Sequence, residues 1–208
     1  MKKVCFITCV IAMVFICCNK DDGNANLPEC EANFEFSDYS LAVGNWWEYR
    51  VKDYGFSIIE YEEYELTLEI IYAPNLGEWG GFKCLLTTET GITDTIMLYE
   101  WPYVYYSNET GNTNFFNNIN LRRSFELGDS WGNTMDTSFV EFCWPNKMVE
   151  GELYDTYKTK RNAIGPNYSL NQSIAVAKNV GIVEFEETVF KLGPASNLKM
   201  TLLDYHTE

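Results

Sequence analysis

Apolar and polar residues alternate along much of the chain from residue 34 onward. The clearest run lies between Glu60 and Tyr72; one phase holds Tyr64, Leu66, Leu68, Ile70 and Tyr72, and the other holds Glu63, Glu65, Thr67 and Glu69. Because successive side chains of a β-strand point to opposite faces, this run predicts a strand with one packed and one hydrated face. Strands of that kind are typical of antiparallel sheets.

The same alternation, bounded by glycine, proline and asparagine, predicts further strands. They are Trp46–Asp53, Phe82–Thr88, Thr93–Glu100, Tyr103–Ser107, Ile119–Phe125, Ser138–Trp144, Lys147–Thr159, Ile174–Lys178, Ile182–Glu186, Val189–Leu192 and a C-terminal strand with Leu198, Met200 and Leu202. In the Lys147–Thr159 strand we expect Val149, Leu153 and Tyr157 to share one face. No segment has a helical repeat longer than two turns.

Many short strands and little helix predict a mainly β fold. We expect a single antiparallel, strongly curved sheet, either a half-barrel or a barrel, with a β-sandwich as the alternative. No segment rich in linker residues interrupts the chain after Phe34, so residues 34–208 are expected to form a single β domain.

Two short segments share one pattern of apolar residues, glycine and tryptophan. They are Leu41–Trp47, with Gly44, and Phe125–Trp131, with Gly128. A glycine permits a positive φ in a tight turn, and the tryptophan three residues later can fill the end of a sheet. The two segments therefore predict equivalent corners of one sheet, and a pair of ligand-binding loops is the alternative.

The N-terminus has the features of an export signal. Lys2 and Lys3 precede an apolar run from Val4 to Cys17, which would rise roughly 21 Å as a helix, short of the ~30 Å hydrocarbon core of a bilayer. The segment from Phe15 to Cys18 resembles the lipobox of bacterial lipoproteins, which implies that residues 1–17 are a signal peptide and that Cys18 is lipidated.

The residues after Cys18 indicate where the exported protein is located. Cys18-Asn19-Lys20-Asp21-Asp22 resembles the export signal of surface lipoproteins in Bacteroidota. Residues 18–33 are expected to form a lipidated flexible tether, because the residues after Cys18 include asparagine, lysine, aspartate, glycine and proline. The resemblance implies a protein anchored in the outer membrane through its N-terminal lipid and facing outward, with a periplasm-facing orientation as the alternative.

Composition restricts the partners. The chain has 208 residues, of which 46% are hydrophobic, and its 15 basic against 30 acidic residues give a net charge of −15. Such a chain folds, because it has enough apolar residues for a core. Nucleic acid is not an expected partner, because polyanion recognition needs an excess of lysine and arginine.

Motifs for catalysis, metals and cofactors are missing from the sequence. His206, the only histidine, lies at the C-terminus, where a catalytic base would be poorly held. Zinc-protease, phosphate-loop and dinucleotide-binding motifs do not occur. We therefore expect no enzyme, metal or cofactor, although the acidic residues leave open a hydrolase that uses two carboxylates.

Three cysteines remain after the signal and the lipidated residue: Cys30, Cys84 and Cys143. Export would permit one disulfide, and Cys84 with Cys143 is the first pair to consider, because both lie in predicted strands. The alternative is that both are small buried apolar side chains.

Aromatic residues are the remaining candidates for a binding site. Trp101, Tyr103 and Tyr105 alternate, so in a strand their rings would line one face about 6.6 Å apart and could hold a sugar or an acyl chain. Trp79 lies among glycines in a predicted loop, where packing explains an aromatic ring less easily. The alternative for the alternating row is an ordinary core.

Three motifs resemble those of bacterial lipoproteins and periplasmic proteins: Leu41–Tyr49, Gly128–Trp131 and Asn179–Phe185. The resemblance extends to the curved half-barrels that carry or receive lipoproteins, and it implies a fold more than an activity. We therefore predict a non-catalytic binding module for an apolar or glycan ligand. The alternative is a structural or assembly partner of an outer-membrane protein complex.

Overall fold

The computed structural model describes residues 33–35, 41–55, 60–73, 81–91, 93–99, 103–108, 119–122, 124–191 and 195–207. Within these ranges every regular element is a strand, and no helix there is long and apolar enough to span a membrane. The strands are β1 (Asn33–Glu35), β2 (Trp46–Gly55), β3 (Glu62–Tyr72), β4 (Gly81–Thr88), β5 (Thr93–Tyr99), β6 (Tyr103–Asn108), β7 (Asn120–Arg122), β8 (Ser124–Glu126), β9 (Ser130–Asn133), β10 (Asp136–Val149), β11 (Glu152–Gly165), β12 (Tyr168–Ala177), β13 (Gly181–Lys191) and β14 (Ser196–His206).

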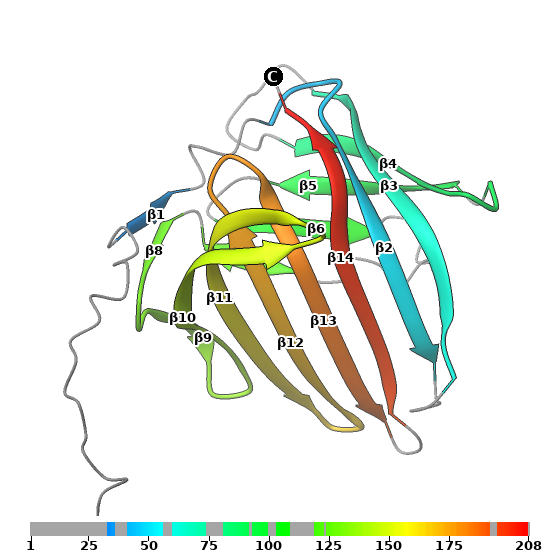
Figure 1. Ribbon diagram of the computed structural model, residues 1–208. Helices are drawn as coiled ribbons and strands as arrows, with labels where there is room; N and C mark the ends of the chain where they lie inside the picture. Colours follow the sequence, from blue (N-terminus) through cyan, green and yellow to red (C-terminus); the bar gives the residue numbers. More distant parts are fainter. Residues whose placement is uncertain are drawn as a thin grey trace, which may run out of the picture.

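Twelve of these strands form one antiparallel sheet in the order β7-β6-β5-β4-β3-β2-β14-β13-β12-β11-β10-β9. The sheet does not close, and its two outermost described strands are β7, with three residues, and β9, with four. Figure 1 shows β3, β2 and β14 to β11 as a front layer with β4, β5 and β6 crossing behind it. The predicted single curved antiparallel sheet is confirmed as an open half-barrel.

The apolar core lies between these two layers. Trp47 and Tyr49 of β2, Leu66 and Leu68 of β3, and Phe185 of β13 each have at most 1% of their surface exposed, and they share one core with Leu86, Ile96 and Leu98 of β4 and β5. We call the face of the sheet that bears these side chains the inner face and the opposite face the outer face. The predicted packed phase of β3 is confirmed by buried Leu66, Leu68 and Ile70, although Tyr72 is exposed after a register shift.

Both predicted glycine–tryptophan corners are present. Gly44 and Gly128 have positive φ angles of 98° and 90°, and each precedes the strand that holds its tryptophan, β2 or β9. Trp47 is buried and donates a hydrogen bond of 2.6 Å to the carbonyl of Val180, and Trp131 is buried against Phe125. Both tryptophans therefore pack in the core, as the structural interpretation of the motif predicted.

The prediction of one strand over Lys147–Thr159 is wrong. Glu150 and Gly151 both have positive φ angles, 46° and 96°, and they form the turn of a hairpin between β10 and β11. Within β11 the alternation breaks at Thr156 and Tyr157, which are consecutive and both buried. Val149 and Tyr157 are therefore buried while Leu153 is 57% exposed. In Figure 1 the yellow end of this hairpin lies in front of β12 and β13 and reaches towards β14.

Other predicted boundaries differ in three places. The segment Ile119–Phe125 is divided into β7 and β8, and β8 pairs with β1 in a separate two-stranded sheet. The strands predicted at Ile182–Glu186 and from Val189 onward belong to one strand, β13, which runs without a break from Gly181 to Lys191. The predicted gap between the strands Ser138–Trp144 and Lys147–Thr159 is a register shift inside β10.

Candidate ligand-binding groove

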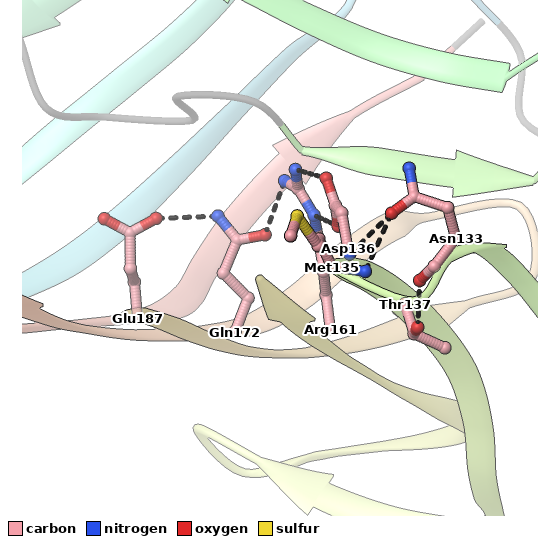
Figure 2. Close-up of polar contacts among 7 residues, drawn as sticks. All are labelled: Asn133, Met135, Asp136, Thr137, Arg161, Gln172 and Glu187. Carbon is pink, nitrogen blue, oxygen red and sulfur yellow. Dashed lines mark hydrogen bonds and ion pairs between the residues drawn. The ribbon is translucent and has the colours of Figure 1, made fainter. Parts of the chain in front are cut away.

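Four polar side chains form a chain of hydrogen bonds across β10, β11, β12 and β13 on the inner face. Figure 2 shows Asp136, Arg161, Gln172 and Glu187 in that order, and we call them the polar ladder. Arg161 donates two bonds to the carboxylate of Asp136, of 2.7 and 2.6 Å, and a third of 3.3 Å to Oε1 of Gln172. The amide nitrogen of Gln172 then donates a bond of 2.7 Å to Oε2 of Glu187.

The polar ladder lies on the inner face because each member follows the alternation of its strand. Arg161 is two residues from buried Thr159, Gln172 is two residues from buried Ile174, and Glu187 is two residues from buried Phe185. Gln172 is 2% and Glu187 8% exposed. Buried polar groups of this kind are stable only when hydrogen-bonded, so the ladder ties four strands together at one level.

The electrostatics of the ladder differ between its two ends. Hydrogen bonds from Arg161 hold the pKa of the Asp136 carboxyl below its usual value. At the other end, burial raises the pKa of Glu187 although the bond from Gln172 and the charge of Arg161 oppose the rise.

The turn before Asp136 is fixed by Asn133, whose side-chain oxygen accepts bonds from the backbone N–H groups of Met135 and Asp136 (Figure 2).

A second row crosses the same strands on the outer face. Direct partners in the register give the sequence Thr137, Asn162, Asn171, Thr188 and Asn197, from β10 to β14, and we call these residues the neutral row. Its first four members are sequence neighbours of the four ladder residues, so the two rows occupy opposite faces of the same stretch of backbone. The ladder therefore lies directly behind the neutral row, whose spacing is set by the backbone pairing of the strands.

An open groove follows the neutral row. It has a volume of about 430 Å³ and is lined by Phe139, Lys160, Asn162, Asn171, Gln172, Ser173, Glu186 and Thr188. The side chains of Asn162 and Asn171 are exposed. Two residues further along β11 and β13, roughly 7 Å away on the same face, Ile164 and Phe190 are 64% and 44% exposed. Both face Ser169 in the register, so apolar side chains flank the polar floor of the groove on this one side.

The β10–β11 hairpin is held against the outer face above this groove. Glu150 at its turn accepts a hydrogen bond of 2.7 Å from Arg50 of β2, and Lys147 forms an ion pair with Glu184 of β13. Burial raises the pKa of Tyr154, and the nearby groups Tyr205, Glu152 and Asp204 add to the rise, which agrees with a hairpin lying on the end of β14. The groove thus has the hairpin as its upper boundary.

The aromatic residues predicted as ligand contacts are only partly described. Tyr103 and Tyr105 belong to β6, which confirms the predicted strand, and β6 is the second strand from one end of the sheet. Their side chains, with Trp79 and Trp101, lie outside the described parts of the structure. Cys18 also lies outside them, and His206 is an exposed residue at the end of β14. The aromatic row and the lipidation site stay predictions.

The two strand cysteines are not bonded to each other. Cys84 is a free, fully buried thiol, and burial raises its pKa to about 12. Cys143 is disulfide-bonded, and its partner lies outside the described residues. The disulfide prediction was thus wrong in its pairing, and the alternative of a small buried apolar side chain is confirmed for Cys84 alone.

Sequence reasoning missed both rows, although one signal was present. The consecutive acids Glu186 and Glu187 lie in a strand, so one of the two has to point to the inner face. The outward neutral residues Asn162, Asn171 and Thr188 come from different strands, and only the register of the whole sheet places them side by side.

Among the described residues no group of three or more acidic, histidine or cysteine side chains could hold a metal ion.

Two solved structures are similar to this chain. One, from Bacteroides fragilis, is described as an exported protein with a YmcC-like fold; the identity is 11% and the TM-score 0.48, over 81% of this chain and 98% of that one. The other, from Parabacteroides distasonis, is described as a lipoprotein; the identity is 11% and the TM-score 0.45, over 85% and 100%. No protein-family model and no curated protein matches the chain. At these values the likeness says nothing about a ligand, which has to be inferred from the groove itself.

Proposed function

We propose that this protein is an exported, lipid-anchored, non-catalytic module that binds a glycan in the groove on the outer face of β10 to β13. The observation that supports it best is the neutral row, which crosses five adjacent strands without a charged residue. Neighbouring strands are about 4.8 Å apart. Sugar units of an extended oligosaccharide advance by a similar distance, so successive units could each meet one member of the row.

The chemistry of the row suits sugar hydroxyl groups. An asparagine amide both donates and accepts hydrogen bonds, and so does a threonine hydroxyl, which matches the dual character of each sugar hydroxyl. Phe139 and Phe190 beside the row offer apolar surface for the C–H faces of sugar rings.

The filled core favours a glycan over an apolar ligand. A lipid or other apolar molecule held inside the half-barrel would need the space now occupied by Trp47, Tyr49 and Phe185, each of which is at most 1% exposed. Such close-packed positions do not open without a large cost. The ligand surface is therefore placed on the outer face, where hydrogen-bonding groups are already accessible.

Export and lipidation are supported by the sequence and by one structural fact. The signal segment, Cys18 and the acidic residues that follow it have the order found in surface lipoproteins of Bacteroidota. Cys143 is disulfide-bonded, and disulfides persist in oxidising compartments outside the cytosol. An outer-membrane anchor facing outward would give the groove access to glycans outside the cell.

Glycan arrays followed by calorimetric titration of the domain without its signal and Cys18 test this function. Asn171→Ala combined with Thr188→Ala is expected to weaken binding more than tenfold, because two hydrogen-bonding groups are lost from the groove. Thr67→Ala is the matched control, since Thr67 lies on the outer face of β3, away from the groove. Absence of binding to any glycan, or equal losses in both variants, would contradict the proposal.

A protein partner in the outer membrane is the second candidate function. The side of the β10–β11 hairpin that faces solvent exposes Trp144, Met148 and Leu153, at 52%, 68% and 57%. Exposed apolar groups in one element are typical of interaction surfaces. Crosslinking in cells, followed by mass spectrometry, would test it: one recurrent outer-membrane partner, lost on Met148→Ser with Leu153→Ser, is expected, and a lack of any recurrent partner would exclude it.

A further inference from the structure

The groove continues from the neutral row towards the β10–β11 hairpin. A second hollow of about 210 Å³ shares Ser173 and Glu186 with the first and is also lined by Lys158, Glu184, Lys199 and Thr201. The shared residues make one continuous depression, with one section along the neutral row and a more charged section next to the hairpin. We call the charged section the upper hollow.

The carboxylates of the upper hollow are already paired. Glu184 forms its ion pair with Lys147, and Glu186 lies 3.1 Å from Nζ of Lys199. Lys158 differs from these lysines. Its only carboxylate neighbour in the described chain is Glu141, with Nζ 4.0 Å from Oε2, and the other oxygen of Glu141 accepts a hydrogen bond from Lys160. The ammonium group of Lys158 therefore lacks a close carboxylate of its own.

The same ammonium group is nonetheless held in place. Nζ of Lys158 lies 5.4 Å from the centre of the Phe142 ring, a distance at which the ring attracts a cation. Phe142 and Lys158 are direct partners in the register of β10 and β11, so the backbone fixes this contact. A positioned cation that shares its one carboxylate, 4.0 Å away, with a second lysine can bind a further anion.

We infer that the upper hollow is a subsite for an anionic substituent and that the bound glycan is an acidic oligosaccharide, with a carboxylate or sulfate group on Lys158. This inference rests on the proposed glycan binding and names its ligand class. Hydroxyl groups of Ser173 and Thr201, which also line the hollow, can donate to the same anion. The net charge of −15 repels a polyanion, whereas one anionic group per few sugars needs only a local cation.

The test compares an acidic oligosaccharide with its carboxyl-reduced form, which keeps the sugar chain and removes the charge. Calorimetric titration of the wild type should give about tenfold tighter binding of the acidic form. Lys158→Gln should abolish this preference, so that the acidic form binds no more tightly than the reduced form. Lys83→Gln, which changes an exposed lysine of β4 outside both hollows, is the matched control and should keep the preference. Thermal unfolding confirms that each variant is folded.

The possible outcomes separate the two proposals. Equal binding of the acidic and reduced forms by the wild type, with loss of both in the Asn171→Ala, Thr188→Ala variant, would overturn the anionic subsite and leave glycan binding in place. A preference that survives in Lys158→Gln would also overturn the assignment of Lys158. Binding of neither form, across a panel of acidic and neutral chains, would overturn the proposed function together with its subsite.

Discussion

Nε2 of Gln172 and Oε2 of Glu187 form a hydrogen bond of 2.7 Å inside the half-barrel, between two side chains that are less than a tenth exposed. The bond orients the amide, because its oxygen accepts from Arg161 on the other side. A buried carboxylate at the end of such a chain makes the stability of the sheet depend on pH.

Glu187→Gln should remove one part of that dependence. In the folded chain burial raises the pKa of Glu187 above its ordinary value, so folding loses stability as pH rises from that ordinary value through the raised one. The introduced amide does not ionise and can still accept from Gln172. We expect the variant and the wild type to unfold at similar temperatures near about pH 4, and the variant to unfold at the higher temperature at neutral pH.

Thermal unfolding followed by circular dichroism between about pH 4 and pH 8 checks this expectation. The lowered pKa of Asp136 acts in the opposite direction, since its contribution is present at neutral pH and is lost as pH falls. This contribution of Asp136 is the same in the wild type and in Glu187→Gln, so it cancels in the difference between their unfolding temperatures. A difference in unfolding temperature that does not change with pH would contradict the role given to Glu187.

Gln172→Leu should destabilise the fold strongly, whereas a change to its neighbour should not. Leucine leaves Arg161 and Glu187 each without one hydrogen bond at buried positions, which costs about 1–3 kcal/mol. Asn171→Ala removes an exposed side chain from the opposite face and is expected to stay within about 0.5 kcal/mol of the wild type. Urea unfolding measures the free energy of unfolding of both variants. Equal losses would show that the inner-face Gln172 contributes no more to stability than the outer-face Asn171.

Cys143 should be linked to Cys30. Cys84 is free, and Cys30 is the one other cysteine that follows the predicted lipidation site. Phe125, which pairs with residue 34 in the β1–β8 sheet, contacts Tyr157, the register partner of Cys143, so the strand after Cys30 is anchored near Cys143.

Peptide mapping of the non-reduced, exported protein checks the pairing. A Cys30–Cys143 peptide is expected, and Cys84 should react with thiol reagents only after unfolding, because burial raises its pKa to about 12. A peptide that joins Cys143 to any other cysteine would refute this pairing.

Cys18→Ser should release the protein from the membrane. The acyl chains predicted on Cys18 contribute about 0.8 kcal/mol for each buried CH₂ group, and the acidic domain itself has no attraction for an anionic lipid surface. Metabolic labelling with an alkyne fatty acid, followed by membrane fractionation, is the measurement. Label and membrane association should disappear together in the variant, and label that persists would place the lipid on another residue.

Trp101→Ala and Tyr103→Ala distinguish the predicted aromatic row from the groove. If the groove holds the glycan, both variants should keep the affinity of the wild type, since β6 and β10 to β13 lie in opposite halves of the sheet. Calorimetric titration with the same glycan gives the answer. A loss of binding with an unchanged unfolding temperature would instead assign the ligand to the row of Trp101, Tyr103 and Tyr105.

Period-two alternation was sufficient to predict the class of the fold and the buried phase of β3. The corners at Gly44 and Gly128 were predictable as well, because a positive φ followed by a buried tryptophan depends on local sequence. The hairpin turn was not, because Glu150 is an unusual residue at positive φ and the alternation continues across it. The groove was beyond local patterns, since Asn162, Asn171 and Thr188 meet only through the register of three strands.

The shortness of the two outermost strands has a consequence for the proposed lipid-anchored protein. A free sheet edge offers unpaired N–H and C=O groups to any other chain, and lipid-anchored copies would meet one another at high local concentration. Here the described edges are β7, with three residues, and β9, with four, while strands of ten to fourteen residues lie in the interior. β9 covers only Asp136–Phe139 of β10, but the rest of that edge carries two register shifts and folds over the outer face (Figure 1). The described edges thus offer a neighbouring copy little regular backbone to start a growing intermolecular sheet.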